Sequence, residues 1–163
     1  MSNGRVGLAI ALAVVALVAC SRPPAGSAGA PPMASSLPLI EYMAHVIEPN
    51  AKQLWRWQGF VVNEKGVTNF EPKNDAEWEE AESAGLTLAE LTYALHQPAR
   101  RRTGQDNWDK RVSDLRDAAA RAATAAERRD LKTFSDAVDQ VNTACVECHY
   151  AFAPHLEAPR PAN

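Results

Sequence analysis

Residues 130–152, DLKTFSDAVDQVNTACVECHYAF, hold the pattern that decides the fold of this chain. Apolar residues recur in it at alternating spacings of four and three, which is the repeat of one face of an α-helix. The stretch therefore predicts an amphipathic helix, with Asp130 suited to its start. The apolar face consists of Phe134, Val138, Val141, Cys145, Cys148 and Phe152. Two cysteines thus occupy positions that such a helix turns toward a protein core.

Both cysteines belong to the run Cys145-Val146-Glu147-Cys148-His149, a Cys-x-x-Cys-His motif. Side chains at positions i and i+3 of a helix lie on one face, so both sulfurs can bond to the same edge of a porphyrin. The motif is typical of covalent c-type haem attachment, in which each thiol forms a thioether and the histidine binds the iron. We therefore expect one haem c per chain, with His149 as the proximal iron ligand.

Other uses of a Cys-x-x-Cys pair fit this chain less well. A thioredoxin-like site would need a preceding strand and a βαβ setting, whereas this motif lies in a helical pattern. A structural zinc site needs four ligands, and the chain has no second cysteine pair. A disulfide between Cys145 and Cys148 would close a short loop and stabilise little. A thiol–disulfide oxidoreductase, with unmodified thiols and no haem, stays open as a third class of function.

The N-terminus carries a predicted signal peptide over residues 1–19. Arg5 precedes an apolar run that is too short to span a bilayer and suits the apolar region of an export signal. The run ends in LVAC at residues 17–20, which resembles the lipobox of bacterial lipoproteins. That resemblance implies cleavage before Cys20 and lipidation of its thiol; ordinary secretory cleavage, which leaves the thiol unmodified, is the alternative. The protein would then be lipid-anchored on the periplasmic side of a bacterial membrane, and Ser21 favours the outer membrane.

Export agrees with the haem motif, because bacteria attach c-type haem outside the cytoplasm. Residues 20–37 read as the lipidated cysteine and a flexible tether of mainly Ser, Pro, Ala and Gly. Removal of residues 1–19 takes away only Arg5, so 16 basic residues remain against 20 acidic ones, a formal net charge of −4. This acidic balance argues against a nucleic-acid partner.

The rest of the chain predicts four helices and no convincing strand, hence an all-α fold. Pro38 suits the first turn of the first helix, and Pro49 is expected to kink it. Phe60-Val61-Val62 could be a strand, but no partner for it is evident. Short or moderate connections favour an up-down-up-down four-helix bundle. The predicted helices cover residues 38–57, 74–97, 106–126 and 130–152.

The order of four helices, an early methionine and a late Cys-x-x-Cys-His motif resembles class II cytochromes c, the cytochrome c′ family, over residues 38–155. The resemblance implies a four-helix bundle with the haem between helices at one end. Residues 156–163 are interpreted as a tail. The family pattern continues with an aromatic residue, here Phe152, and then a basic one, where this chain has Ala153. That departure counts against gas chemistry on the proximal haem face. Dimers through the first two helices are frequent in the family, which implies a homodimer.

Met43 is the predicted ligand on the opposite side of the iron. It lies about five residues into the first helix, and His149 lies about four residues before the end of the fourth, so the two fall at similar depths in an up-down-up-down order. A methionine thioether is a known axial ligand of c-type haem. The alternative is that Met43 only packs on the haem as a flexible apolar side chain and leaves the iron five-coordinate. His45 is expected to face solvent.

Further candidates lie at the same end of the predicted bundle. His96 closes the second helix, where it would cap the helix end or act as a ligand or propionate partner. Arg100, Arg101 and Arg102 could pair with haem propionates or dock an acidic redox partner, or they could form a solvated loop. Trp108 could wall the haem pocket, which is a packing role first.

These features predict a lipid-anchored cytochrome that passes single electrons to and from redox partner proteins. In such a protein the cofactor carries the chemistry, and the polypeptide sets its potential and exposure. No Ser-His-acid set or paired carboxylate stands out in the sequence, so we expect an electron carrier and not an enzyme. The alternative is a cytochrome c′-like protein that binds nitric oxide or carbon monoxide at five-coordinate iron.

Overall fold

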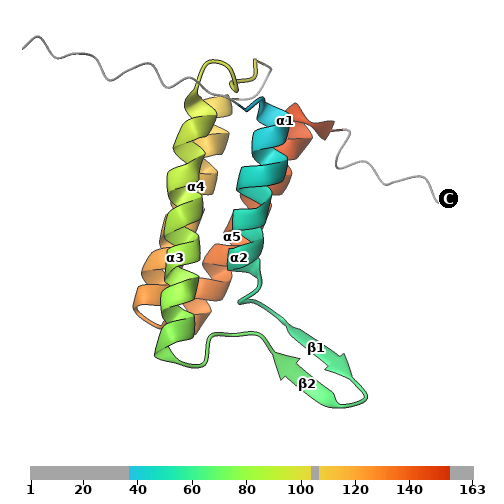
Figure 1. The fold of residues 1–163 in the computed structure, drawn as a ribbon, viewed down its shortest axis with the longest axis vertical. Helices are drawn as coiled ribbons and strands as arrows, with labels where there is room; N and C mark the ends of the chain where they lie inside the picture. Colours follow the sequence, from blue (N-terminus) through green and yellow to red (C-terminus); the bar gives the residue numbers. More distant parts are fainter. Residues whose placement is uncertain (1–36, 104–106, 155–163) are drawn as a thin grey trace, which may run out of the picture. The chain divides into compact units, whose positions relative to one another are not determined.

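The computed structural model describes residues 37–103 and 107–154, which form four helical segments and one small sheet (Figure 1). The mostly helical composition confirms the helical content expected from the sequence. The predicted signal peptide, Cys20 with its tether and the tail over 156–163 lie outside the described residues. None of the described helices is both long enough and apolar enough to cross a membrane.

The first helical segment, called helix one below, changes its winding along its length. It consists of α1 (Leu39–Tyr42), the π-helical turn η1 (Met43–Ile47) and α2 (Glu48–Trp55). Pro49 lacks an amide hydrogen and crowds the carbonyl four residues before it. The wider π turn lies just before this proline, and the Asn50 side-chain amide donates to the Val46 carbonyl at 2.7 Å. Helix one therefore continues past Pro49 and ends two residues before its predicted end.

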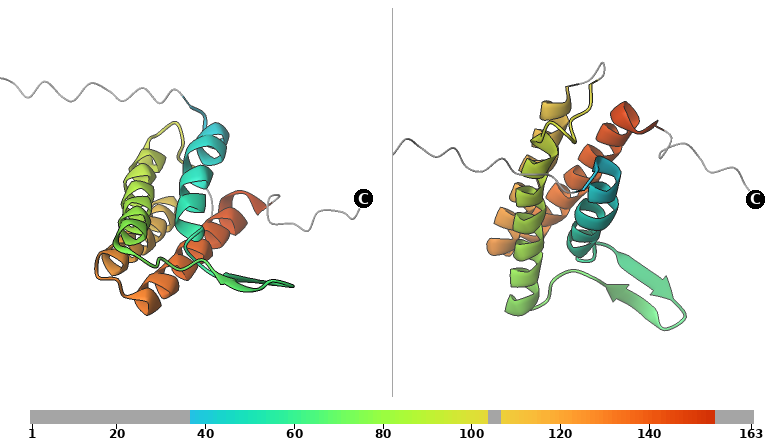
Figure 2. Two further views of the ribbon diagram at one scale, coloured as in Figure 1. Left: turned by 60° about the horizontal axis from the view of Figure 1, so that its bottom comes forward. Right: turned by 45° about the horizontal axis from the view of Figure 1, so that its top comes forward.

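The expectation that the strand at Phe60–Val62 has no partner is wrong. β1 (Phe60–Asn63) pairs with β2 (Gly66–Asn69) in an antiparallel hairpin that projects from the helices (Figures 1 and 2). Lys65 N donates to Asn63 Oδ1 at 2.9 Å in the turn, and Gly66 supplies the positive φ of +115° that follows it. All residues of both strands are exposed. β2 has one apolar side chain, so periodicity could not reveal it.

The other three helical segments begin where the sequence supplies a cap. In each, an Asn or Asp oxygen accepts a hydrogen bond at 3.0–3.1 Å from the amide three residues later. The helix predicted to start at residue 106 is capped by Asn107 and begins at Trp108, two residues after its predicted start. The segments are α3 (Asp75–Thr92) with the 3₁₀ turn η2 (Tyr93–His96), α4 (Trp108–Glu127) and α5 (Leu131–Phe152), capped by Asn74, Asn107 and Asp130.

α4 is the centre of the packing, because α3 and α5 both lie along it while helix one packs on α3. Its inner face is rich in alanine, which permits close approach of a neighbouring helix. At Gly85 of α3, an added Cβ would lie 2.9 Å from Ala123 N and 3.0 Å from Ala119 O. The backbones of α3 and α4 thus meet at a point where even a methyl group does not fit.

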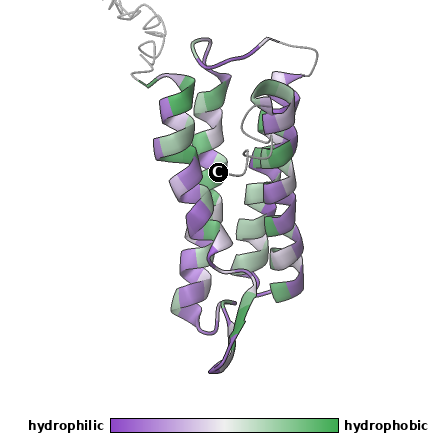
Figure 3. Cartoon of the chain, turned by 90° about the vertical axis from the view of Figure 1, so that its right-hand side faces the viewer, coloured by the Kyte–Doolittle hydropathy of each residue, from purple (hydrophilic) through white to green (hydrophobic). Residues whose placement is uncertain are grey.

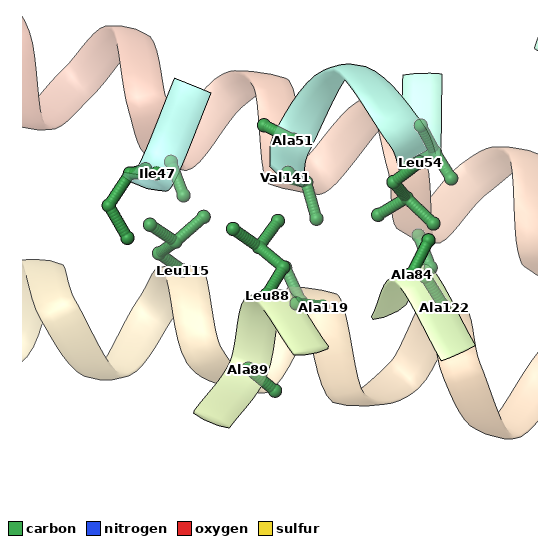
Figure 4. Close-up of a cluster of buried hydrophobic side chains, with 14 of the residues drawn as sticks. Ile47, Ala51, Leu54, Ala84, Leu88, Ala89, Leu115, Ala119, Ala122 and Val141 are labelled. Atoms are coloured by element: carbon green, nitrogen blue, oxygen red, sulfur yellow. The ribbon is translucent and has the colours of Figure 1, made fainter. Parts of the chain in front are cut away.

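All four helical segments contribute to one apolar core, and polar residues cover much of their outer faces (Figure 3). Figure 4 shows Ile47 of helix one, Leu88 of α3, Leu115 of α4 and Val141 of α5 within this core. The indole of Trp78 meets the ring of Phe134 edge-on, with centroids 5.8 Å apart. The largest fully buried apolar side chains are Phe134, Leu54, Leu88, Val112, Val138 and Val141.

Candidate functional site

The Cys-x-x-Cys-His motif lies in the last turns of α5, where the helix leaves the core. The apolar face of α5 is fully buried at Phe134, Val138 and Val141 and becomes half-buried at Cys145 and Cys148. Cys145 still packs against the apolar core. The expectation that both cysteines face the core thus holds only in part, because both are half-buried and Cys145 is the one of the two that packs against the core.

His149 is also half-buried, and α5 keeps its helical hydrogen bonding through this residue. The Ala153 amide donates to the His149 carbonyl at 2.7 Å and closes the last turn. The two thiols and the imidazole are therefore carried by continuous helix, with the i, i+3 relation between Cys145 and Cys148 intact. A rigid helical support is what attachment of one flat group through two thioethers and one ring nitrogen requires.

The α1 end of helix one lies beside the C-terminal end of α5 (Figure 1). Met43 begins the π turn that directly follows α1. Met43 is half-buried and packs against the apolar core, as do its neighbours Leu39 and Val46. His45 faces solvent as predicted: its side chain is 71 % exposed, and its Nε2 lies 3.2 Å from Glu41 Oε2. Of Met43 and His45, Met43 is therefore the residue whose side chain is directed inward.

The space between helix one and α5 differs from the space between the other helices. The backbones of α3 and α4 approach closely, as do those of α4 and α5, and in the described part of the chain helix one and α5 make no comparable approach. At the far end, just after helix one, Gln58 Nε2 donates to Asp139 Oδ1 of α5 at 2.7 Å. At the motif end, the half-buried side chains of Met43, Cys145 and Phe152 all border the apolar core.

This arrangement fits a haem in the chemistry of its donors. A porphyrin supplies four nitrogen ligands of its own, so the protein needs to provide only axial ligands and attachment points. Within residues 37–103 and 107–154, no three His, Cys, Asp or Glu side chains gather to hold a bare metal ion. The residues that would hold a haem are Cys145 and Cys148, by thioethers, with His149 and Met43 as the candidate iron ligands.

His96 and Arg101 meet on one carboxylate at the motif end. His96 Nδ1 lies 2.9 Å from Asp109 Oδ1, and the Arg101 guanidinium pairs with Asp109 Oδ2. Asp109 lies in the first turn of α4, where a negative charge is favourable. Arg101 is thus not simply a solvated loop residue. The hypothesis that His96 serves the haem stays a prediction.

Arg100 occupies a place that sequence reasoning did not foresee. Its side chain is buried, with 5 % exposed, and its guanidinium lies 3.9 Å from the centre of the Tyr42 ring. The expectation of a solvated loop is therefore wrong for this arginine, and its burial also leaves it unsuited to dock a partner protein. Arg102, two positions on, is exposed.

Trp108 connects the start of α4 to the end of α5. The indole is buried, its Nε1 donates to the Leu95 carbonyl at 2.9 Å, and its ring meets Phe152 at a centroid distance of 5.0 Å and an angle of 72°. Such edge-to-face contacts are favourable for aromatic pairs. The structure thus gives Trp108 a packing role beside the motif.

The sequence did not predict an ion pair that joins the motif to α4. Glu147, one of the two variable positions of Cys-x-x-Cys-His, pairs with Arg111 of α4. Two charged residues 36 positions apart in the sequence carry no local signal of such a contact. The pair ties the motif turn of α5 to α4.

Comparisons with protein-family models, with curated proteins and with solved structures find no match for this chain.

Proposed function

We propose that this protein is a monohaem c-type cytochrome that transfers single electrons. In this proposal the four helices form an up-down-up-down bundle, and the haem lies at the end that carries Met43 and the Cys-x-x-Cys-His motif. The observation that carries the proposal is that Cys145, Cys148 and His149 are all half-buried on the last turns of one helix, with Cys145 packed against the apolar core.

Each residue has one role in the proposed site. Cys145 and Cys148 bind the haem through thioethers, and His149 holds the iron on the proximal side. Met43 is the proposed distal ligand, supported by its half-buried side chain, which packs against the core directly after α1. A haem supplies an iron that alternates between the ferrous and ferric states. The same two axial ligands in both states would keep reorganisation small during electron transfer.

The cellular setting belongs to the same proposal. Cys20 would carry the lipid anchor, so the cytochrome would face the periplasm from a bacterial membrane, with the outer membrane favoured. Its partners would be redox proteins and, as the family resemblance implies, a second copy of the chain. We propose no enzymatic turnover and no nucleic-acid partner.

One observation favours a second candidate function. Met43 packs against the core as other apolar residues of helix one do, and a methionine that only packs would leave the iron five-coordinate. The protein would then bind nitric oxide or carbon monoxide on the Met43 side. Gas binding is therefore the alternative, and it predicts a different spectrum.

The experiment begins with the full chain produced in a bacterium that attaches c-type haem. Mass spectrometry of the peptide that contains Cys145 and Cys148 should show the mass of one haem, whereas an unmodified peptide would refute the proposal and favour thiol–disulfide chemistry. The dithionite-reduced protein is then examined before and after addition of carbon monoxide. Sharp low-spin bands that do not change with the gas indicate a closed sixth position. A high-spin spectrum that shifts with the gas supports the alternative.

Two matched methionine variants make the ligand test specific. Met43→Leu keeps an apolar side chain of similar volume but removes the sulfur, so it should convert a low-spin spectrum into a gas-sensitive one with little effect on folding. Met33→Leu, in the predicted tether, is the matched control and should change nothing. A low-spin spectrum that survives in Met43→Leu would exclude this residue as the ligand.

A further inference from the structure

The first turns of helix one have few buried contacts of their own. Among residues 37–46, Tyr42 alone is buried, with 5 % exposed. The α-helical part before the π turn is four residues long, and one helical turn contributes little stability by itself. Met43 directly follows Tyr42 and itself packs against the core, so the contacts that hold Tyr42 contribute to the position of Met43.

Those contacts come from Arg100 and from the end of the α3–η2 segment. The Arg100 guanidinium stacks on the Tyr42 ring, its Nε donates to Leu37 O at 3.3 Å, and its Nη1 donates to Ala94 O at 3.0 Å. The Tyr42 hydroxyl donates to Leu91 O at 2.7 Å. We call these two side chains the Arg100–Tyr42 latch. It joins the start of helix one to residues about fifty to sixty positions later in the sequence.

The surroundings of Arg100 explain how a buried cation is accommodated here. Within the part of the chain that the structure describes, no carboxylate forms an ion pair with Arg100, and its charge faces backbone carbonyls and an aromatic ring. Ala94 O belongs to the last turn of η2, where the helix end carries partial negative charge. The face of the Tyr42 ring is also negative, and a desolvated cation over it is strongly attracted. The Arg100 guanidinium group is thus contacted by two backbone carbonyls and by the Tyr42 ring.

We propose that Arg100 is a positioning residue, which acts through Tyr42 to hold the first turns of helix one and therefore Met43 at the haem end. The proposal rests on the proposed function in so far as Met43 binds iron. Arginine suits this task because a planar guanidinium can stack on a ring and donate in two directions at once. A lysine would keep the charge but could not reproduce that geometry.

The first test measures the latch without reference to iron. Amide hydrogen exchange of the haem-loaded full chain is compared for the wild type, Arg100→Gln and Arg102→Gln. The last variant is the control, because Arg102 is an exposed arginine in the same loop. We expect exchange over residues 39–47 to rise about tenfold in Arg100→Gln, a factor that corresponds to about 1.4 kcal/mol, with α4 unchanged. Arg102→Gln should match the wild type. Equal exchange over 39–47 in both variants would overturn the proposal.

Two further variants keep the test decisive if Arg100→Gln does not fold. Arg100→Lys retains the charge and should still speed exchange over 39–47. Tyr42→Phe retains the ring under the guanidinium but loses the bond to Leu91 O, so its effect should be smaller than that of Arg100→Lys. The reverse order, or no effect in either, would contradict the latch.

The second test asks whether the latch reaches the iron. In Arg100→Lys we expect a lower reduction potential than in the wild type and a fraction of protein that binds carbon monoxide, because Met43 is held less firmly. Faster exchange with an unchanged spectrum and potential would refute the positioning of Met43. A Met43→Leu protein with an unchanged spectrum would refute Met43 ligation itself, and the exchange comparison would then still judge the latch.

Discussion

Gly85 in α3 provides a sharp test of the packing between α3 and α4. In an unhindered helix, replacement of an interior glycine by alanine stabilises by about 1 kcal/mol. In this protein the new Cβ would lie 2.9 Å from Ala123 N and 3.0 Å from both Ala119 O and Ala123 Cβ. Two of these three atoms belong to the α4 backbone, which cannot rotate away as a side chain would. The helices must therefore move apart.

The two effects have opposite signs, and the clash is the larger. Overpacking of a well-packed interior costs typically about 1–3 kcal/mol, and backbone neighbours place Gly85 toward the upper end of that range. Subtraction of the propensity gain of about 1 kcal/mol leaves a net loss of about 1–2 kcal/mol for Gly85→Ala. With a urea m-value of about 2 kcal/mol/M, the unfolding midpoint should fall by about 0.5–1 M.

The assay is urea unfolding of the full chain followed by far-ultraviolet circular dichroism. Ser83→Ala is the matched control, because Ser83 is exposed two positions earlier in the same helix. It offers the propensity gain without the clash and should leave the midpoint equal or slightly higher. A midpoint for Gly85→Ala at or above the wild-type value would refute the close approach of the α3 and α4 backbones.

Three further outcomes follow from contacts described above. Asn74→Ala removes the side-chain cap of α3 and should cost about 1 kcal/mol in urea unfolding; an unchanged midpoint would show that the cap is dispensable. Trp108→Phe keeps a ring beside Phe152 but leaves the buried Leu95 carbonyl without its indole donor, and a loss of about 1–3 kcal/mol is expected in the same assay, so full wild-type stability would contradict this contact. Burial raises the pKa of Tyr42 above its ordinary value of 10.0, against a smaller opposite effect of the Arg100 charge. The folded state therefore holds this proton more tightly than the unfolded state, and the stabilisation is complete below pH 10 and is lost as the pH rises through the raised pKa. Unfolding midpoints measured between about pH 8 and pH 11 should decline less steeply in Tyr42→Phe, and identical slopes would contradict the burial effect.

Sequence reasoning was most successful where the signal lay in neighbouring residues. Asp130 caps α5 as expected, and Asn74 caps α3 at the predicted start of that helix, because an N-cap needs only one suitable side chain before a helical pattern. The apolar repeat of 130–152 correctly predicted α5. The effect of Pro49 was harder to foresee, since a kink and a π turn are both ways to accommodate a missing amide.

Sequence reasoning failed where the answer depended on residues far apart in the chain. The hairpin was missed because four-residue strands give almost no periodic signal, and pairing between Val62 and Val67 requires a turn of the right shape. A solvated loop was one of the alternatives for Arg100, because three consecutive arginines resemble such a loop. Its burial follows from a ring at position 42 and a carbonyl at position 37, neither of which is visible from the local sequence.

The sequence by itself determined the helical segments and which chemical groups the motif presents, because backbone propensity, capping and the spacing of two thiols and an imidazole are properties of adjacent residues. Only the tertiary structure decided which groups around the motif are buried, paired or exposed. It separated Arg100, enclosed over Tyr42, from the exposed Arg102, and it paired Glu147 with Arg111. The physical reason is that burial and pairing depend on which helix faces meet, and in this chain the meeting faces come from segments many residues apart.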